Sequence, residues 1–275
     1  MVNRLRAAVD YRDLLFNLVA RDLKVRYRNS FLGFIWSLLN PLLMMLVFWF
    51  VFTTLMPTST YPDFPVFILV GLLPWNWCSA AVAGGTLSLV NNAHLIKKVY
   101  FPRELLPISV VLSNMINYLL ALPVLFALIL IMHPAYETSL GPRPIIGPAL
   151  LWLPLVLVTQ IVFLAGMTLF LSALNVFFRD TEVIIDVGLT AWFFLTPIVY
   201  SLEQLAKNPD ITSWMYRVNP MAALVGAYRK ILYFGQFGSL EDIGGLLRTL
   251  VTATVILGVG YAFFTATSRR FGEEL

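Results

Sequence analysis

The chain has 275 residues, of which 59% are hydrophobic and 12% are charged, and its formal net charge is +4 at pH 7. A soluble domain carries about 25% charged residues, so this composition excludes an ordinary soluble protein and indicates an integral membrane protein. The basic residues adjoin apolar segments, as in membrane proteins with a positive inner side, so we expect no nucleic-acid partner.

The N-terminal segment predicts an amphipathic helix over 10–29 that leads directly into a membrane span. Its apolar residues recur with helical spacing, at Tyr11, Leu14, Leu15, Leu18 and Val19. We expect this helix to lie in the membrane interface, with its apolar side in lipid and its cations toward head groups or a partner. It is either a simple anchor or an element that transmits force from a cytosolic partner into the first span.

Six segments are apolar enough to cross a bilayer, which needs roughly 20 apolar residues per helix. They are 31–56, 65–90, 105–132, 148–178, 184–200 and 243–267. They form a single transmembrane domain over 1–275, with membrane lipids around it. Lys and Arg concentrate in the N-terminal segment, in the 91–104 loop and in the C-terminal tail, so we expect both termini in the cytosol. The charged N-terminus does not resemble a cleavable signal peptide, so the first span should direct insertion.

The segment 201–235 is too irregular for another span. Pro220 suits the first turn of a helix, but the apolar stretch that it opens ends at Phe234 and contains Arg229 and Lys230. We expect two short re-entrant helices that dip into the outer leaflet and are buried in protein or line a wet cavity. The alternative is an amphipathic helix lying flat on the outer surface. The predicted fold is therefore all-α, with six spans, an interface helix and two re-entrant helices before the last span.

Two cytosolic segments are candidates for function. The loop 91–107, NNAHLIKKVYFPRELLP, is too apolar for a free loop, so we expect it to dock on a partner. Alternatively, the loop only supplies the positive charge that sets membrane orientation and caps a helix at Pro102. The turn LNVFFRD at 174–180 places Arg179 and Asp180 at the membrane surface, where they form either a local ion pair or a cytosolic gate.

Aromatic residues cluster toward the outer ends of several predicted spans. The default explanation is the aromatic belt at the membrane interface. A pore lined with rings would instead suit a sugar chain, whose C–H faces pack on aromatic rings. Our candidates for a substrate channel are Trp36, Trp192, Phe193, Phe194 and Tyr200.

The chemistry inside the predicted membrane region is sparse. Intramembrane carboxylates, which ion-coupled transporters usually need, are almost absent, and the chain has no P-loop motif, so an external energy source is indicated. The single cysteine, Cys78, excludes an internal disulfide and a cysteine-based metal cluster. We find no nucleophile–base constellation and expect no catalytic residue, metal or cofactor in this chain.

Five segments together resemble the permeases of type-2 ABC transporters that export lipid-linked polysaccharides such as O-antigen, capsule or teichoic acid. They are DLKVRYRNSFLGFIWSLLNPLL at 22–43, KKVYFPRELLP at 97–107, LNVFFRD at 174–180, FFLTPIVY at 193–200 and YRVNPMAALVGAYRKIL at 216–232. The resemblance implies a homodimer in the bacterial cytoplasmic membrane, two separate cytosolic ATPase subunits that hold ATP and Mg, and a polyprenyl-linked polysaccharide substrate. This chain would then be the pore-forming subunit and not itself an enzyme.

The resemblance also implies where the ATPase acts: on the interface helix and on the loop between the second and third spans. The residues assigned to ATPase coupling are Arg21, Lys24, Arg26, Arg28, Leu95, Lys97, Lys98, Tyr100, Phe101 and Arg103. Two rival functions stay open from the sequence: a type-2 exporter of a small molecule or drug, and a membrane-embedded glycosyl- or phosphotransferase.

Overall fold

The computed structural model describes residues 11–27, 35–55, 64–132, 147–200 and 209–275, and every regular element within them is helical. The α-helices are α2 (Arg12–Tyr27), α3 (Ile35–Phe50), α4 (Phe64–Asn91), α5 (Ala93–Lys98), α6 (Leu105–Met132), α7 (Leu153–Phe177), α8 (Thr181–Leu195), α10 (Pro209–Val218), α11 (Pro220–Tyr228), α12 (Leu240–Thr267) and α13 (Phe271–Glu274). Short 3-10 or π-helical turns are η1 (Val51–Leu55), η3 (Pro148–Trp152), η4 (Arg229–Tyr233) and η5 (Ser268–Arg270). The all-helical prediction is thus confirmed for the described residues.

Four helical segments are long and apolar enough to cross a membrane: Phe64–Asn91, Leu105–Ile131, Pro148–Phe177 and Leu240–Glu274. One shorter apolar helix covers Leu39–Leu55. Helix α8 has 15 residues and carries Glu182 and Asp186 in its first half. The structure differs from the span expected over 184–200, since α8 ends at Leu195. Thr196, the residue before Pro197, is extended because a following proline disfavours helical conformation.

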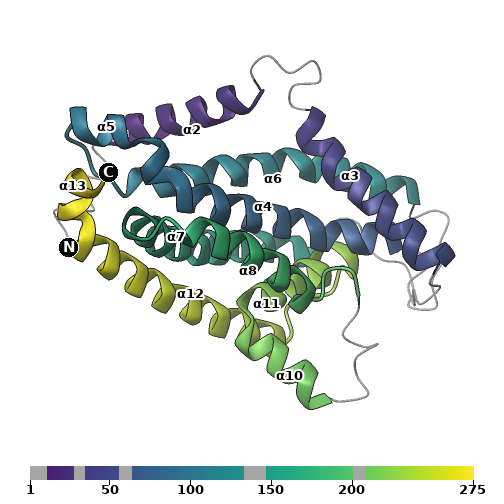
Figure 1. Cartoon of the computed structure of the whole chain (residues 1–275). Helices are drawn as coiled ribbons and strands as arrows, with labels where there is room; N and C mark the ends of the chain where they lie inside the picture. The colour runs from purple at the N-terminus through teal and green to yellow at the C-terminus, as the bar shows by residue number, and fades with distance from the viewer. Residues whose placement is uncertain (1–10, 28–34, 56–63, 133–146, 201–208) are drawn as a thin grey trace.

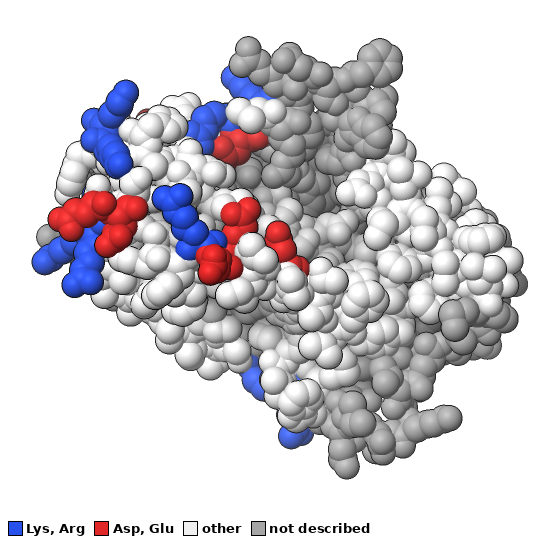
Figure 2. Space-filling model, in the orientation of Figure 1, with Lys and Arg blue, Asp and Glu red and all other residues white. Residues whose placement is uncertain are grey.

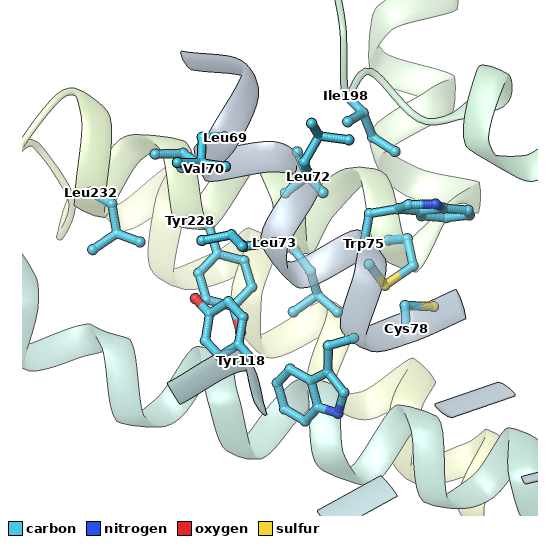
Figure 3. Packing of buried hydrophobic residues seen from close by; sticks show 14 of the residues in the cluster. Leu69, Val70, Leu72, Leu73, Trp75, Cys78, Tyr118, Ile198, Tyr228 and Leu232 are labelled. Atoms are coloured by element: carbon cyan, nitrogen blue, oxygen red, sulfur yellow. The ribbon is translucent and has the colours of Figure 1, made fainter. Parts of the chain in front are cut away.

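Helix α4 is the centre of the bundle and runs between α6 and α7 (Figure 1). Within its apolar window 78% of the residues are buried, because neighbouring helices cover it on all sides. Figure 3 shows its side chains above the rings of Tyr118 and Tyr228, whose centroids are 5.7 Å apart. The Tyr228 hydroxyl donates to Gln160 at 2.8 Å, and Gln160 donates to the Pro74 carbonyl at 2.9 Å. This polar chain links α11, α7 and α4 inside the core.

Small residues allow α7 and α12 to pack backbone against backbone. A Cβ atom on Gly166 would lie 2.5 Å from the Leu257 nitrogen, and a Cβ atom on Gly260 would collide with the Gly166 carbonyl. Such contacts are typical of helix association in membranes, where burial of apolar surface gives little driving force between helices. Opposite this seam, α12 exposes Val251 and Val255, as expected of a surface that faces lipid.

Helix α2 differs from expectation in what its apolar face contacts. Leu18 and Val19 are buried, and Leu18 belongs to a cluster with Ile96, Phe101 and Leu105. The expectation that this face lies in lipid is therefore wrong. The reason is that α5 and the first turns of α6 offer an apolar surface of their own, so the three elements cover one another.

Candidate coupling surface and translocation face

Polar side chains fix α2 to the end of the bundle that carries α5. Arg21 donates to the Asn92 side chain at 3.0 Å and pairs with Asp22 at 3.0 Å. Asp22 in turn lies 3.5 Å from the hydroxyl of Ser109, near the start of α6. The Arg21 side chain is therefore already engaged within the chain, whereas Lys24 is exposed and forms no ion pair with another described residue.

The segment that follows α5 separates its side chains sharply into exposed and buried ones. Tyr100 is 96% exposed, while its neighbour Phe101 is 6% exposed and packs into the cluster under α2. Lys97 and Lys98 are exposed, and Leu95 is half-buried. A buried anchor next to an exposed ring gives a fixed surface that can receive a partner.

Arg103 joins this loop to the C-terminal end of the last long helix. Its Nη1 donates to the carbonyl of Ser268, the C-cap residue of α12. The same carbonyl accepts from the Phe271 backbone nitrogen, so Arg103 adds a charged donor where α12 passes into η5. Between the loop and this helix end lies a pocket of about 890 Å3, whose lining includes Tyr11, Tyr100 and Arg269.

Charge is distributed unevenly over the molecule. Figure 2 shows most of the acidic and basic side chains toward the end that carries α5 and α13, a few basic ones at the lower edge, and none among the described side chains at the right of this face. The Tyr11 and Arg269 side chains line the same pocket, so the start of α2 and the end of α12 lie together at the charged end.

The predicted pair Arg179 and Asp180 lies in the turn between α7 and α8, and both side chains are exposed. No ion pair within 4 Å joins these two described residues. The turn is held instead by Thr181, whose hydroxyl donates to the Phe178 carbonyl at 2.5 Å.

The candidate channel rings separate into two groups. Trp192 and Phe193 turn inward, with centroids 5.7 Å and 5.8 Å from the Trp75 ring, and so hold α8 against α4. Phe194 is 63% exposed, and the Tyr200 hydroxyl donates to the Phe194 carbonyl at 3.0 Å. Only Phe194 among these four offers most of its ring to a passing chain.

Some predicted residues have side chains outside the described part of the molecule. Trp36 and Arg26 lie on helices, but the placement of their side chains is not described, and Arg28 lies outside the described residues altogether. Part of the predicted re-entrant segment, 201–208, is also outside them.

Two residues outside the predicted set bind the backbone at the end of α8. Asn219 donates to the Leu195 carbonyl, and Arg229 donates to the Pro197 carbonyl. The dipeptide Asn219-Pro220 was recognisable as a helix start, but nothing in it indicated a bond to α8. Arg229 was visible only as a charge in an apolar stretch.

These features define a polytopic α-helical membrane protein whose charged side chains gather mostly at one end. Among the described residues, no group of three His, Cys, Asp or Glu side chains could hold a metal ion.

The chain belongs to the ABC-2 type transporter family, whose model matches residues 13–233. It is 38% identical over 275 residues to the O-antigen export system permease protein RfbA of Myxococcus xanthus, covering 100% of both chains. It is 33% identical to a Klebsiella pneumoniae protein of the same name, over 96% of this chain and 95% of the relative. It is 24% identical to the polysialic acid transport protein KpsM of Escherichia coli, over 88% of this chain and 90% of the relative.

Proposed function

We propose that this chain is the permease subunit of an ATP-driven exporter that moves lipid-linked polysaccharide of the O-antigen kind across the bacterial cytoplasmic membrane. The full-length match to O-antigen export permeases carries this proposal, because it spans every predicted span and loop. The match to a polysialic acid transport protein supports the same class of cargo.

The proposed topology has six spans with both termini in the cytosol. The four long helices are joined by α3 with η1 and by α8, which complete the count. The position of the charged end, with α5, α13 and the start of α2, supports assigning that end to the cytosol. The near-complete burial of Met221 and Tyr228 supports a re-entrant role for α11, because irregular backbone at membrane depth needs protein around it.

The proposed coupling surface consists of the exposed residues of α2 and α5 and the loop that ends at Arg103. Two cytosolic ATPase subunits, which hold ATP and Mg, act on it. The exposed ring of Tyr100 beside the buried ring of Phe101 supports docking, since an aromatic side chain left this open is a typical interface anchor. Closure of the ATPases when they bind ATP would then move α2 and α5 as one unit, because Leu18 of α2 and Ile96 of α5 pack in the same hydrophobic cluster.

The proposed path lies between two copies of the chain, where α3 and α8 face each other. Both helices expose apolar side chains, among them Val47 and Phe50 on α3 and Val187 and Phe194 on α8. An apolar face of this extent on a membrane helix suits lipid, a second copy or the C–H faces of sugars. Separation of the copies would admit the glycan from the inner leaflet.

The direct test is to purify the protein from its native membrane in detergent and identify by mass spectrometry what accompanies it. The proposal predicts an ABC ATPase and a polyprenyl-linked glycan, with ATP hydrolysis by the complex. Recovery of the ATPase with a small hydrophobic molecule would favour a drug exporter instead. Glycan synthesis by the purified chain alone would contradict the proposal in favour of a membrane-embedded transferase.

A further inference from the structure

The far end of α8 is tied to one short, buried segment by two polar side chains. That segment comprises Asn219, which caps α11, then α11 itself and η4, and its residues Asn219 and Arg229 both reach the backbone where α8 ends. Neither residue lies on α8 or among the exposed residues of the proposed path.

Asn219 first serves its own helix. Its side-chain oxygen accepts from the backbone nitrogens of Met221 at 3.0 Å and of Ala222 at 3.2 Å, which is an N-cap. An N-cap needs only the oxygen of the side chain, so the amide nitrogen has a separate use.

That nitrogen binds the end of α8. It donates to the Leu195 carbonyl at 3.2 Å and to the Thr196 hydroxyl at 3.0 Å. The oxygen also accepts from the indole nitrogen of Trp192 at 2.9 Å. One side chain therefore caps α11 and holds the last turn of α8.

Arg229 binds the residues that follow Thr196, namely Pro197 and Ile198. Its guanidinium donates to the Pro197 carbonyl at 2.5 Å and to the Ile198 carbonyl at 2.5 Å, and it lies 3.6 Å above the Phe67 ring. The side chain is buried, and its planar fork matches two carbonyls in a way that lysine cannot. Arg229 begins a π-helical turn, a feature often found at functional sites.

The remainder of α8 is held less firmly. Val183, Ile184 and Val187 in its first half are each about two-thirds exposed, whereas Met221 and Val225 of α11 are fully buried. One end of α8 is thus fixed to the core, and the other is attached mainly through the turn after α7.

We propose that Asn219 and Arg229 are positioning residues for export, which fix the outer end of α8 so that the helix pivots there while its inner end moves. This inference rests on the proposed function, because it assumes that the exposed face of α8 borders the path. These two residues, together called the α8 clamp, keep Phe194 in place. They confine the movement to the cytosolic half of α8.

The test uses the full permease–ATPase complex in nanodiscs, with a nitroxide label on Phe194→Cys in a Cys78→Ala background. Asn219→Asp keeps the oxygen that caps α11 and accepts from Trp192 but removes the nitrogen that donates to Leu195 and Thr196, so α11 stays capped while the end of α8 loses these two bonds. Arg229→Lys keeps the charge but loses the fork. The matched control is Arg248→Gln, since Arg248 also donates to a carbonyl, that of Tyr216, but does not contact α8.

We expect Asn219→Asp and Arg229→Lys to raise the ratio of mobile to immobile label at position 194 by about tenfold, as loss of hydrogen bonds of this kind implies. The mobility of a label on Val183→Cys should not change in these variants. The unfolding temperature of Asn219→Asp should equal that of the parent. In unlabelled complexes that retain Phe194, export should fall while ATP hydrolysis continues. Unchanged mobility at position 194, or raised mobility with export at the level of the parent, overturns the inference.

The transport assay tests the proposed function, and the mobility of the label tests the inference about Asn219 and Arg229, so one can fail without the other. If the unmodified complex hydrolyses ATP without exporting glycan, the proposed function is contradicted. The mobility of the label at position 194 still decides in that case whether Asn219 and Arg229 clamp α8.

Discussion

Single residues in this protein act mostly by allowing or fixing contact between helices. Gly166 lets the backbone of α12 approach α7, and Gly85 does the same for α4 against Thr168, whose Cγ2 would lie 2.5 Å from an added Cβ. The polar residues at the core, such as Gln160, bind carbonyls of neighbouring helices and so fix the register of the packing.

At this scale we predict that Gly166→Ala destabilises the fold by about 1–3 kcal/mol, because the methyl group collides with the backbone of Leu257 and α12 must move away. The measurement is thermal unfolding in detergent. Gly258→Ala is the matched control, since no atom lies within 4 Å of an added Cβ there. Equal unfolding temperatures for the two variants would show that the seam tolerates a methyl group.

At the scale of elements, the segment from α5 to Arg103 combines a buried anchor with an exposed surface. Tyr100→Ala should weaken binding of the ATPase by about tenfold, as for an aromatic interface anchor, and leave the unfolding temperature unchanged. Phe101→Ala should instead lower stability by about 3 kcal/mol, because it opens a cavity in the cluster beneath α2. Binding by surface plasmon resonance and thermal unfolding separate the two effects. Equal binding by Tyr100→Ala and the parent would remove this loop from the docking surface.

The link between this loop and α12 gives a second prediction for the elements. Arg103→Gln removes the charged donor to the Ser268 carbonyl, so the loop can shift relative to the end of α12. We expect the complex to assemble and hydrolyse ATP while exporting less glycan per ATP. Arg269→Gln is the control, as Arg269 lines the same pocket but is exposed. A normal ratio of export to hydrolysis in Arg103→Gln would show that the link is not used in coupling.

For the whole molecule, the sequence predicts best the positions of the long apolar helices, because the bilayer sets their length and composition. Uninterrupted apolar runs mark α4, α6, α7 and α12 because a span must match the hydrocarbon thickness. Hydropathy does not say which face meets which neighbour, so it could not tell that Trp192 packs inward while Phe194 is exposed. Nor could it pair Arg229 with the Pro197 carbonyl, since the two residues meet only through the packing of α11 against the end of α8.

In the proposed mechanism, a partner ATPase drives glycan movement through a pore built from this chain. The most direct measurement is translocation of a lipid-linked glycan across proteoliposomes that contain the permease and its ATPase. We predict ATP-dependent appearance of the glycan on the far side, abolished by a hydrolysis-deficient ATPase. Translocation at the same rate without ATP, or with the permease omitted, would contradict the claim.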